Sequence, residues 1–320
     1  MSEQQTPSQE GLPLVVILGS SGMLGSYVVR EFSKNNIPVL VFNSDQMDIA
    51  SLQDVELLDD LLKGSKKRMV VINCAAYTNV DGAEEDVEQA YYTNAVGCIN
   101  LACVMRKIPN SFVLNISTDY VYNSAPLSEF THPHIPCTVY GKSKLMGELA
   151  LSAVPSMSLR VSWLYGATRQ TFPQYVAENY GAPWLKIVEG NRSRPTYCGT
   201  LATNIRRLCQ NTKWFTDPPK VPRVMNYSLS PDQTRKQFAT KVMGMLGIED
   251  PQFQIIPFKE YRAQRLAPVP EDSTLYSYHE TFGMQEHSLW RDLHQYLTEL
   301  WGADYVEVWK EKRAQTKKVV

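Results

Sequence analysis

The stretch Leu14-Val15-Val16-Ile17-Leu18-Gly19-Ser20-Ser21-Gly22-Met23-Leu24-Gly25 decides the fold. An apolar run typical of a buried strand leads into three glycines spaced as Gly19-x-x-Gly22-x-x-Gly25, and a segment of helical character follows. Glycines at such a strand-to-helix turn let the backbone approach a pyrophosphate, whose charge the helix N-terminus attracts. The stretch therefore predicts a dinucleotide-binding turn, with Met23 and Leu24 opening the helix beside the cofactor.

Strand-like and helical segments alternate after this turn. Further apolar strand candidates lie at 39–42, 69–73, 112–116 and 159–164, and helical stretches lie near 22–34, 51–63, 84–106 and 140–153. The strand candidates are rich in Val, Ile and Leu on both faces, as expected for parallel strands covered by helices on either side. We therefore expect an α/β fold: a Rossmann-type doubly wound parallel sheet with a smaller C-terminal substrate lobe.

The alternation becomes irregular and proline-rich from about residue 166, which sets the expected domain boundaries. Residues 1–11 are polar and predicted to be disordered. Residues 12–165 are predicted to form the dinucleotide-binding domain, and residues 166–309 a substrate-binding lobe whose segments interleave with the first domain. Residues 310–320 form a basic tail.

Composition excludes several classes of function. The 320 residues are 43% hydrophobic and 20% charged with a net charge of −1, so no overall field draws the chain to nucleic acid or to a membrane surface. No apolar run reaches the roughly 18 residues of a membrane span, and no secretory segment is apparent, which predicts a cytoplasmic protein. Its six cysteines form no Cys-x-x-Cys pair and are expected to be free thiols. We expect no metal site, because His132-Pro133-His134 and Cys137 lie in a proline-rich loop without a fourth ligand.

Two further motifs indicate hydride-transfer chemistry, namely Ser117-Thr118-Asp119-Tyr120 and Tyr140-Gly141-Lys142-Ser143-Lys144. Tyrosine has a pKa near 10 in water, which makes it a weak acid–base catalyst at neutral pH. Lys144 would lie on the same helix face as Tyr140, where its positive charge would favour the phenolate. The hydroxyl of Thr118 would hold a substrate carbonyl oxygen. We therefore take Thr118, Tyr140 and Lys144 as the candidate catalytic residues.

Taken together, these motifs resemble an extended short-chain dehydrogenase/reductase, and most closely the dTDP-4-dehydrorhamnose reductases. The similarity covers about residues 14 to 200, in order and at that family's spacing. Its pieces are the Gly19–Gly25 turn, Met47-Asp48-Ile49, Asn73-Cys74-Ala75-Ala76-Tyr77-Thr78-Asn79-Val80-Asp81, Ser117-Thr118-Asp119-Tyr120-Val121-Tyr122, Tyr140-Gly141-Lys142-Ser143-Lys144 and Arg160-Val161-Ser162-Trp163-Leu164-Tyr165-Gly166.

The resemblance implies a reaction and a role for each catalytic candidate. Tyr140 would protonate the C4 oxygen of a nucleotide-linked 4-keto-6-deoxysugar while the nicotinamide delivers hydride to C4. Lys144 would hold the nicotinamide ribose, and Thr118 would orient the ketone. The product would be a dTDP- or UDP-linked rhamnose.

The resemblance also implies binding contacts. The sugar pocket would be lined by Asp119, Tyr120 and Trp163, although Trp163 is also compatible with plain core and Asp119 with a turn cap. The cofactor would run beside Cys74, Ala75, Ala76 and Tyr77, with its adenine flanked by Asp48 and Ile49. Asp48 is also compatible with a helix N-terminal position before Ser51.

The residues after the second predicted strand, 39–42, partly indicate which cofactor is bound. A carboxylate at the strand end would bind the 2′-hydroxyl of NAD and repel a 2′-phosphate. Here the strand ends at Asn43-Ser44, so NADP is permitted, but no nearby Arg demands it. We count Asn43 among the cofactor contacts and expect NADP(H) to be preferred, with NAD(H) also accepted.

One departure from the family pattern keeps a second function open. The family's Asp-Gln-x-Gly-x-Pro-Thr segment aligns with residues 190–196, where only the Pro and the Thr are retained. Arg192 and Arg194 in this segment would contact a sugar-nucleotide pyrophosphate or serve as surface charges. The regulatory beta subunit of methionine adenosyltransferase resembles the same reductases, so an NADP-binding partner of the methionine adenosyltransferase catalytic subunit is the alternative. The oligomeric state, including a homodimer, stays open.

Overall fold

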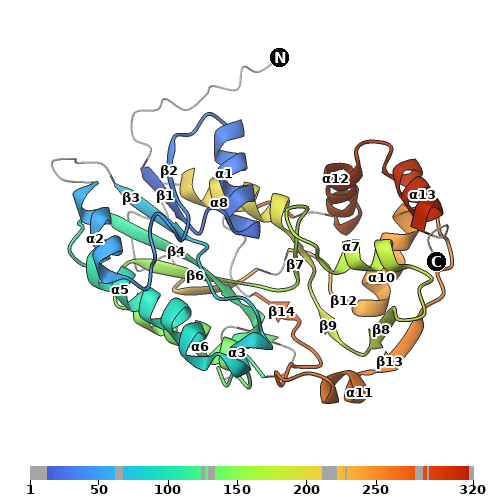
Figure 1. Cartoon of the computed structure of the whole chain (residues 1–320). Helices are drawn as coiled ribbons and strands as arrows, with labels where there is room; N and C mark the ends of the chain where they lie inside the picture. The colour runs from blue at the N-terminus through green and yellow to red at the C-terminus, as the bar shows by residue number, and fades with distance from the viewer. Residues whose placement is uncertain are drawn as a thin grey trace.

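The computed structural model describes residues 13–61, 68–123, 127–128, 134–210, 222–227, 229–277, 284–286 and 288–316. Figure 1 shows two parts side by side, a larger one around a central sheet and a smaller one built mainly of helices. The predicted disordered segment 1–11 and the end of the basic tail, 317–320, lie outside the described residues. None of the described helices is both long and apolar enough to cross a bilayer.

The larger part is organised by a parallel six-stranded sheet in the order β11-β6-β4-β3-β1-β2. Five of these strands were expected from apolar runs, and the prediction of a doubly wound parallel α/β fold is confirmed. The strands are β1 (Leu14–Leu18), β2 (Val39–Phe42), β3 (Met69–Asn73), β4 (Ser111–Thr118), β6 (Ser156–Val161) and β11 (Val224–Asn226).

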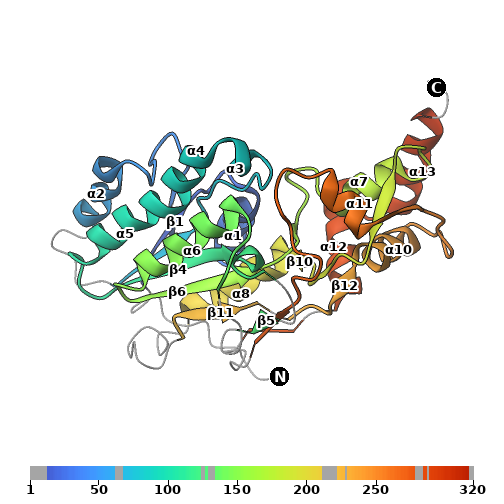
Figure 2. The same ribbon diagram turned by 90° about the horizontal axis from the view of Figure 1, so that it is seen from below.

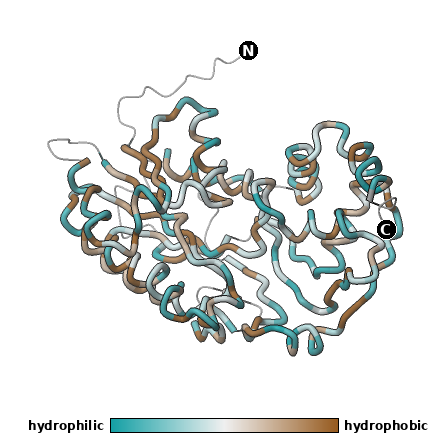
Figure 3. The backbone as a smooth tube through the Cα atoms, in the orientation of Figure 1, coloured by the Kyte–Doolittle hydropathy of each residue, from teal (hydrophilic) through white to brown (hydrophobic). Residues whose placement is uncertain are grey.

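Helices cover both faces of the sheet, because neighbouring residues of each strand point to opposite sides. Val15 and Ile17 of β1 enter one core with α1 (Met23–Lys34) and α8 (Cys198–Gln210). Val16 and Leu18 enter a second core, which is closed by α2 (Leu52–Asp60), α5 (Gly97–Met105) and α6 (Val139–Leu151). Figure 2 shows the helices flanking the sheet, and Figure 3 shows apolar residues concentrated along its strands.

The strand order reverses between β1 and β3, because β1 has β2 as its neighbour on one side and β3 as its neighbour on the other. Ligands of open α/β sheets bind at such a switch point, outside the carboxyl ends of the strands. Gly19 follows β1 and Cys74 follows β3, and the Cys74 amide donates to the Leu18 carbonyl at 3.0 Å. The fold therefore brings two predicted cofactor segments together at this point.

The predicted helix at 84–106 is interrupted at Asp86, whose backbone is not helical, and it is not regular after that point. It divides into α3 (Gly82–Glu85), α4 (Val87–Tyr91), a π-helical turn η1 (Tyr92–Val96) and α5. The widened turn holds the buried side chain of Asn94, which bonds outside the helix. A π-helical turn inside an α-helix commonly marks a functional constraint, and periodicity alone does not reveal it.

The smaller part contains α7 (Phe172–Asn179), α10 (Arg235–Met245), α11 (Phe258–Ala263), α12 (Leu289–Trp301) and α13 (Tyr305–Thr316), with the parallel pair β8 (Lys186–Glu189) and β13 (Gln254–Pro257). Short two-stranded pairings connect it to the larger part: β7 (Leu164–Tyr165) with β10 (Thr196–Tyr197), β9 (Arg192–Ser193) with β12 (Gln233–Thr234), and β5 (Leu127–Ser128) with β14 (Leu275–Tyr276).

The two parts share segments and a core. Helix α8 and strand β11 follow residue 165 in the chain, yet both belong to the layers of the larger part. The aromatic positions near the C-terminus, Trp301, Tyr305 and Trp309, are at most 8% exposed and join the same hydrophobic cluster as β1 and α1. These aromatic side chains therefore pack in the core that the two parts have in common.

Candidate functional site

A cavity of about 440 Å³ opens at the carboxyl edge of the sheet, where the two parts meet. Its walls come from the turn after β1, the loop after β3, the end of β4, helix α6 and the segment 161–171. Of the residues predicted from the sequence, those in the wall are Gly22, Met23, Leu24, Cys74, Ala76, Thr118, Asp119, Tyr120, Tyr140, Lys144 and Trp163.

The glycine turn is packed so closely that larger residues are excluded. Gly19 has a φ of +70°, and a Cβ there would lie 2.6 Å from the Ala75 amide nitrogen. A Cβ on Gly25 would lie 2.1 Å from the Gly19 carbonyl oxygen. The helix that follows begins at Gly22 without a side-chain cap, which leaves its first N–H groups for a ligand. These observations fit the turn to a dinucleotide pyrophosphate.

The candidate catalytic residues converge on the cavity from two elements. Tyr140 and Lys144 stand four residues apart on α6, whose N-terminus is fixed by the Thr138 hydroxyl accepting from the Gly141 amide at 2.9 Å. Thr118 ends β4 and forms a side-chain hydrogen bond with Tyr140. All three line the same cavity, although Thr118 and Lys144 are 26 positions apart in the sequence.

Burial, rather than Lys144, controls the ionisation of Tyr140. Loss of solvent raises the pKa of Tyr140 to about 12, and the hydrogen bond with Thr118 opposes this rise only in part. The Lys144 ammonium donates instead to the Ile116 carbonyl at 2.7 Å, and burial lowers its own pKa. Tyr140 is therefore a protonated phenol at neutral pH, and the effect of Lys144 on its phenolate stays a prediction.

Asp119 and Tyr120 form the side of the cavity nearest the smaller part. Asp119 is 2% exposed, and burial raises its pKa to about 6 despite hydrogen bonds from the hydroxyls of Ser273, Thr118 and Ser193. The ring of Tyr120 meets that of Tyr140 edge to face at 5.7 Å between centroids. Tyr120 is therefore placed to hold the ring of Tyr140 in position.

Asn94 is a site-forming residue that the sequence analysis missed. Its side chain accepts from the Tyr77 amide at 2.9 Å and donates to the Tyr77 carbonyl at 3.1 Å. It also donates to the Ser143 hydroxyl of α6 at 2.9 Å. Asn94 thus ties the loop 74–77 to the helix that carries Tyr140. A polar residue within the apolar 94–105 segment was the only available signal.

Several predicted cofactor contacts lie outside the cavity wall. Asn43 accepts from the amides of residues 45 and 46 in the turn after β2. Asp48 is exposed and accepts from the Ala50 amide at 2.9 Å, while Ser51 is the N-cap of α2. Ile49 is 2% exposed and packs in the core against Gly97. Four more predicted contacts belong to the same segments as wall residues but do not line the cavity, namely Gly19, Gly25, Ala75 and Tyr77. The adenosine contacts stay a prediction.

Trp163 is held in a strained conformation between the two parts. Its φ of +40° is uncommon for a residue with a large side chain. The guanidinium of Arg235, the first residue of α10, lies 3.6 Å from the centroid of its ring. Trp163 lines the cavity and also packs against the hydrophobic core, so both sequence interpretations describe part of its surroundings.

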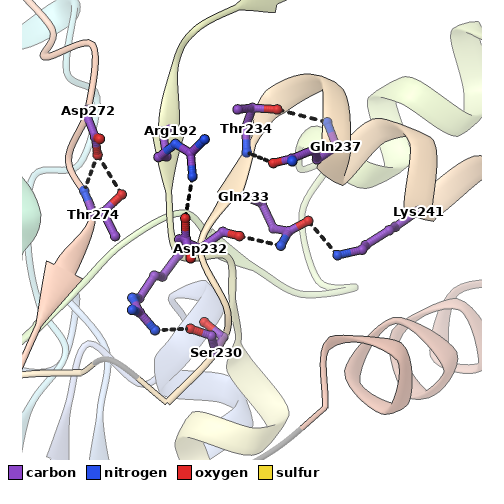
Figure 4. A network of polar contacts seen from close by, with 10 residues as sticks. Arg192, Ser230, Asp232, Gln233, Thr234, Gln237, Lys241, Asp272 and Thr274 are labelled. Atoms are coloured by element: carbon purple, nitrogen blue, oxygen red, sulfur yellow. Dashed lines mark hydrogen bonds and ion pairs between the residues drawn. The ribbon is translucent and has the colours of Figure 1, made fainter.

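Arg192 and Arg194 are engaged within the protein and do not line the cavity. Arg192 forms an ion pair with Asp232, and both side chains are more than a third exposed. Arg194 donates to the Ser230 carbonyl at 2.6 Å and lies over the ring of Tyr276. Figure 4 shows Arg192 and Asp232 among polar pairs that include Thr234 with Gln237 at the start of α10. Their contact with a pyrophosphate stays a prediction.

A buried polar network lies beneath the catalytic helix. Arg160 of β6 is fully buried and forms a two-pronged contact with Glu148 of α6, at 2.9 and 2.5 Å. Glu148 also accepts from the hydroxyl of Ser117, next to Thr118. Arg160 further donates to the Tyr122 hydroxyl at 2.6 Å. The network joins β4, β6 and α6, and motif spacing gave no sign of it.

The fold and this site define a dinucleotide-binding protein of the short-chain dehydrogenase/reductase class: a doubly wound sheet, a glycine turn at its switch point, and Thr, Tyr and Lys on one cavity. No group of three or more His, Cys, Asp or Glu side chains among the described residues is arranged to hold a metal ion.

Comparison with known proteins gives the family. The profile of the RmlD substrate binding domain matches residues 14–301, and the chain belongs to that family. The chain is 30% identical over 240 residues to the spore coat polysaccharide biosynthesis protein SpsK of Bacillus subtilis, covering 73% of this chain and 80% of that protein. It is 33% identical over 206 residues to dTDP-4-dehydrorhamnose reductase of Mycobacterium tuberculosis, covering 61% of this chain and 65% of that enzyme.

A solved structure shares the fold. The dTDP-4-dehydrorhamnose reductase of Bacillus anthracis, in complex with NADP, superposes with a TM-score of 0.74 and 24% identity. The superposition covers 90% of this chain and 99% of that one, so the likeness includes the smaller part as well as the sheet.

Proposed function

We propose that the protein is a sugar-nucleotide reductase, which reduces the C4 ketone of a dTDP- or UDP-linked 4-keto-6-deoxysugar to give a rhamnose. The observation that carries this proposal is the convergence of Thr118, Tyr140 and Lys144 on one cavity beside the glycine turn. Family membership and the names of the relatives support the same reaction.

Each residue has a defined role in the proposed reaction. The bound nicotinamide supplies hydride to C4 of the sugar. Tyr140 donates its phenolic proton to the C4 oxygen, and a pKa of about 12 keeps that proton in place at neutral pH. The Thr118 hydroxyl orients the ketone. Lys144 holds the ribose of the cofactor, and its buried charge makes loss of the proton from Tyr140 easier as the reaction proceeds.

We propose NADPH as the preferred cofactor, with NADH accepted. The second strand ends at Phe42, and the residue that follows is Asn43 rather than a carboxylate. No acidic side chain at that point repels a 2′-phosphate. Initial rates with NADPH and with NADH at equal concentrations test this preference, and a faster rate with NADH at every concentration would contradict it.

The test of function is turnover of dTDP-4-dehydrorhamnose with the wild-type protein and Tyr140→Phe. NADPH consumption should fall by roughly 10²–10⁴-fold in the variant, because the general acid is lost while the ring stays in place. NADPH affinity should be retained. Wild-type turnover by Tyr140→Phe would show that Tyr140 is not the acid.

The regulatory-subunit alternative is not favoured, because the relatives described above carry the names of reductases and of a polysaccharide biosynthesis protein. It makes a distinct prediction. A wild-type protein that binds NADPH tightly, turns over neither dTDP- nor UDP-linked substrate, and retains methionine adenosyltransferase in a pull-down would replace the reductase proposal.

We also propose a homodimer in the cytoplasm. Helices α5 and α6 pack side by side in the larger part, and their outer residues Ile99, Met146 and Leu149 are 43–63% exposed. An apolar face of this kind fits a second copy of itself across a two-fold axis. Sedimentation of the wild type and of Leu149→Glu tests it: a monomeric wild type would contradict the proposal. Cell fractionation tests the location.

A further inference from the structure

Arg235 is a charged side chain that lacks a charged partner in the part of the chain that the structure describes. Its guanidinium lies 3.6 Å from the ring centroid of Trp163 and 4.5 Å from that of Phe172. Its side chain makes one long hydrogen bond, from Nε to Asn191 Oδ1 at 3.4 Å. Both terminal nitrogens are therefore without a hydrogen-bond acceptor among the described residues.

The nearby acidic groups are already committed elsewhere. Asp232 pairs with Arg192, and Asp81 pairs with Arg265 at 2.6 Å. Asp119 acts on Arg235 through space, but its hydrogen bonds come from hydroxyl groups rather than from the guanidinium. Burial accordingly lowers the pKa of Arg235 to about 10, as expected for a cation that has lost water without gaining a carboxylate.

The guanidinium also stands beside the candidate active site. The ring of Trp163 forms one wall of the cavity and the surface on which Arg235 stacks. Tyr120 lines the same cavity and lies near Arg235. Burial raises the pKa of Tyr120, and the charge of Arg235 opposes this rise in part. Arg235 does not itself line the cavity, but it brings a positive charge from α10 of the smaller part next to Trp163 and Tyr120, two residues of the cavity wall.

We propose that Arg235 binds the diphosphate of the nucleotide-linked substrate, an inference that rests on the proposed function. A guanidinium matches phosphate oxygens with two parallel hydrogen bonds, and stacking on aromatic rings fixes its plane in advance. The cofactor has its own diphosphate site at the turn Gly19–Gly25, on the larger part. Arg235 therefore serves the second diphosphate in the complex, and its two free nitrogens are the donors.

Nucleotide binding to Arg235→Met tests the proposal, with Lys236→Met as the matched control. Lys236 is the exposed next residue of α10, so its replacement removes the same charge from the same helix end. Calorimetric titration with dTDP, UDP and thymidine provides the probes. Arg235→Met should bind the diphosphates about tenfold to a hundredfold more weakly than wild type, because charge-assisted hydrogen bonds are lost.

Thymidine lacks phosphate, so its affinity should be the same in wild type and Arg235→Met, and NADPH affinity should be unchanged. Lys236→Met should bind both diphosphates like wild type. Arg235→Lys keeps the positive charge but loses the planar guanidinium, and it guards against misfolding of the methionine variant. Its affinity for the diphosphates should lie between those of wild type and Arg235→Met. Equal diphosphate affinity in wild type and Arg235→Met would overturn the inference, as would a wild-type protein that binds neither diphosphate.

The outcome is separable from the test of function. Loss of diphosphate affinity in Arg235→Met, together with a wild type that fails to reduce dTDP-4-dehydrorhamnose, would uphold Arg235 as a diphosphate site and reject the reductase proposal. Full turnover by wild type with unaltered diphosphate binding in Arg235→Met would uphold the reductase proposal and reject Arg235 as a diphosphate site.

Discussion

Two arginines, one buried and one half-buried, show how differently the two parts of the molecule surround a charge. Arg160, under the catalytic helix, has Glu148, Tyr122 and His134 as partners for its guanidinium nitrogens. Arg235, at the start of α10, has two aromatic rings and one long hydrogen bond. A charge with all its partners holds its surroundings in one arrangement, whereas a charge without them beside a cavity wall leaves donors for the ligand that we propose.

The largest expected difference is in stability. Arg160→Met leaves Glu148 buried without its cation, and breaking such a pair costs about 3–5 kcal/mol of unfolding free energy. Urea denaturation monitored by circular dichroism measures it. The double variant Arg160→Met with Glu148→Leu is the control, because removing both charges should recover most of the loss. A single variant as stable as wild type would show that the ion pair between Arg160 and Glu148 does not stabilise the folded protein.

Asp119 gives the corresponding test for a buried acid, with pH as the variable. Its pKa is raised from 3.8 to about 6 by burial, so the folded state holds the proton more tightly than the unfolded state. Stability from this group is fully present below the unfolded pKa and is lost as pH rises through the folded value. Asp119→Asn should therefore gain stability relative to wild type, by about 2 kcal/mol, between about pH 4 and pH 7.

Denaturation of both proteins at the two pH values measures this difference, and the pH effects of all other groups cancel in it. A difference that stays constant would mean that Asp119 has the same pKa in the folded protein as in the unfolded chain, and one that falls as pH rises would mean that its folded pKa is lowered.

The smallest expected effect on stability is that of Arg235→Met, and it separates the roles of the two arginines most clearly. Arg235→Met should change the unfolding free energy by no more than about 1 kcal/mol in either direction without nucleotide, since the lost stacking is offset by removal of an uncompensated charge. Denaturation in the presence and absence of dTDP measures it. A loss as large as that of Arg160→Met would show that Arg235 is a structural residue.

The larger part was predictable because its chemistry lies in short contiguous motifs. The glycine spacing after β1 and the four-residue separation of Tyr140 and Lys144 are fixed by local geometry, so residue patterns specify them. The strands were visible as apolar runs for the same reason. The pKa of Tyr140 was not predictable, because it depends on burial by residues distant in the sequence.

The smaller part was less predictable because the role of its arginines depends on whether each has a hydrogen-bond or ion-pair partner in the fold. Arg192, Arg194 and Arg235 are indistinguishable in sequence, and only the fold shows which one has no carboxylate or carbonyl partner. Glu148 and Asn94 of the larger part were not predictable for a different reason, since the hydrogen bonds of each join elements far apart in the chain. Periodicity identifies the helices that carry such residues but not the contacts that give them a role.

The central claim is that hydride and proton reach one sugar carbonyl in the cavity between the two parts. The most direct measurement is mass spectrometry of the sugar nucleotide formed from dTDP-4-dehydrorhamnose and NADPH carrying deuterium at its transferable position. The account predicts a single deuterium at C4 of the product with wild type and almost no product with Tyr140→Phe. A sugar recovered without deuterium, from a protein that binds both NADPH and dTDP, would contradict it.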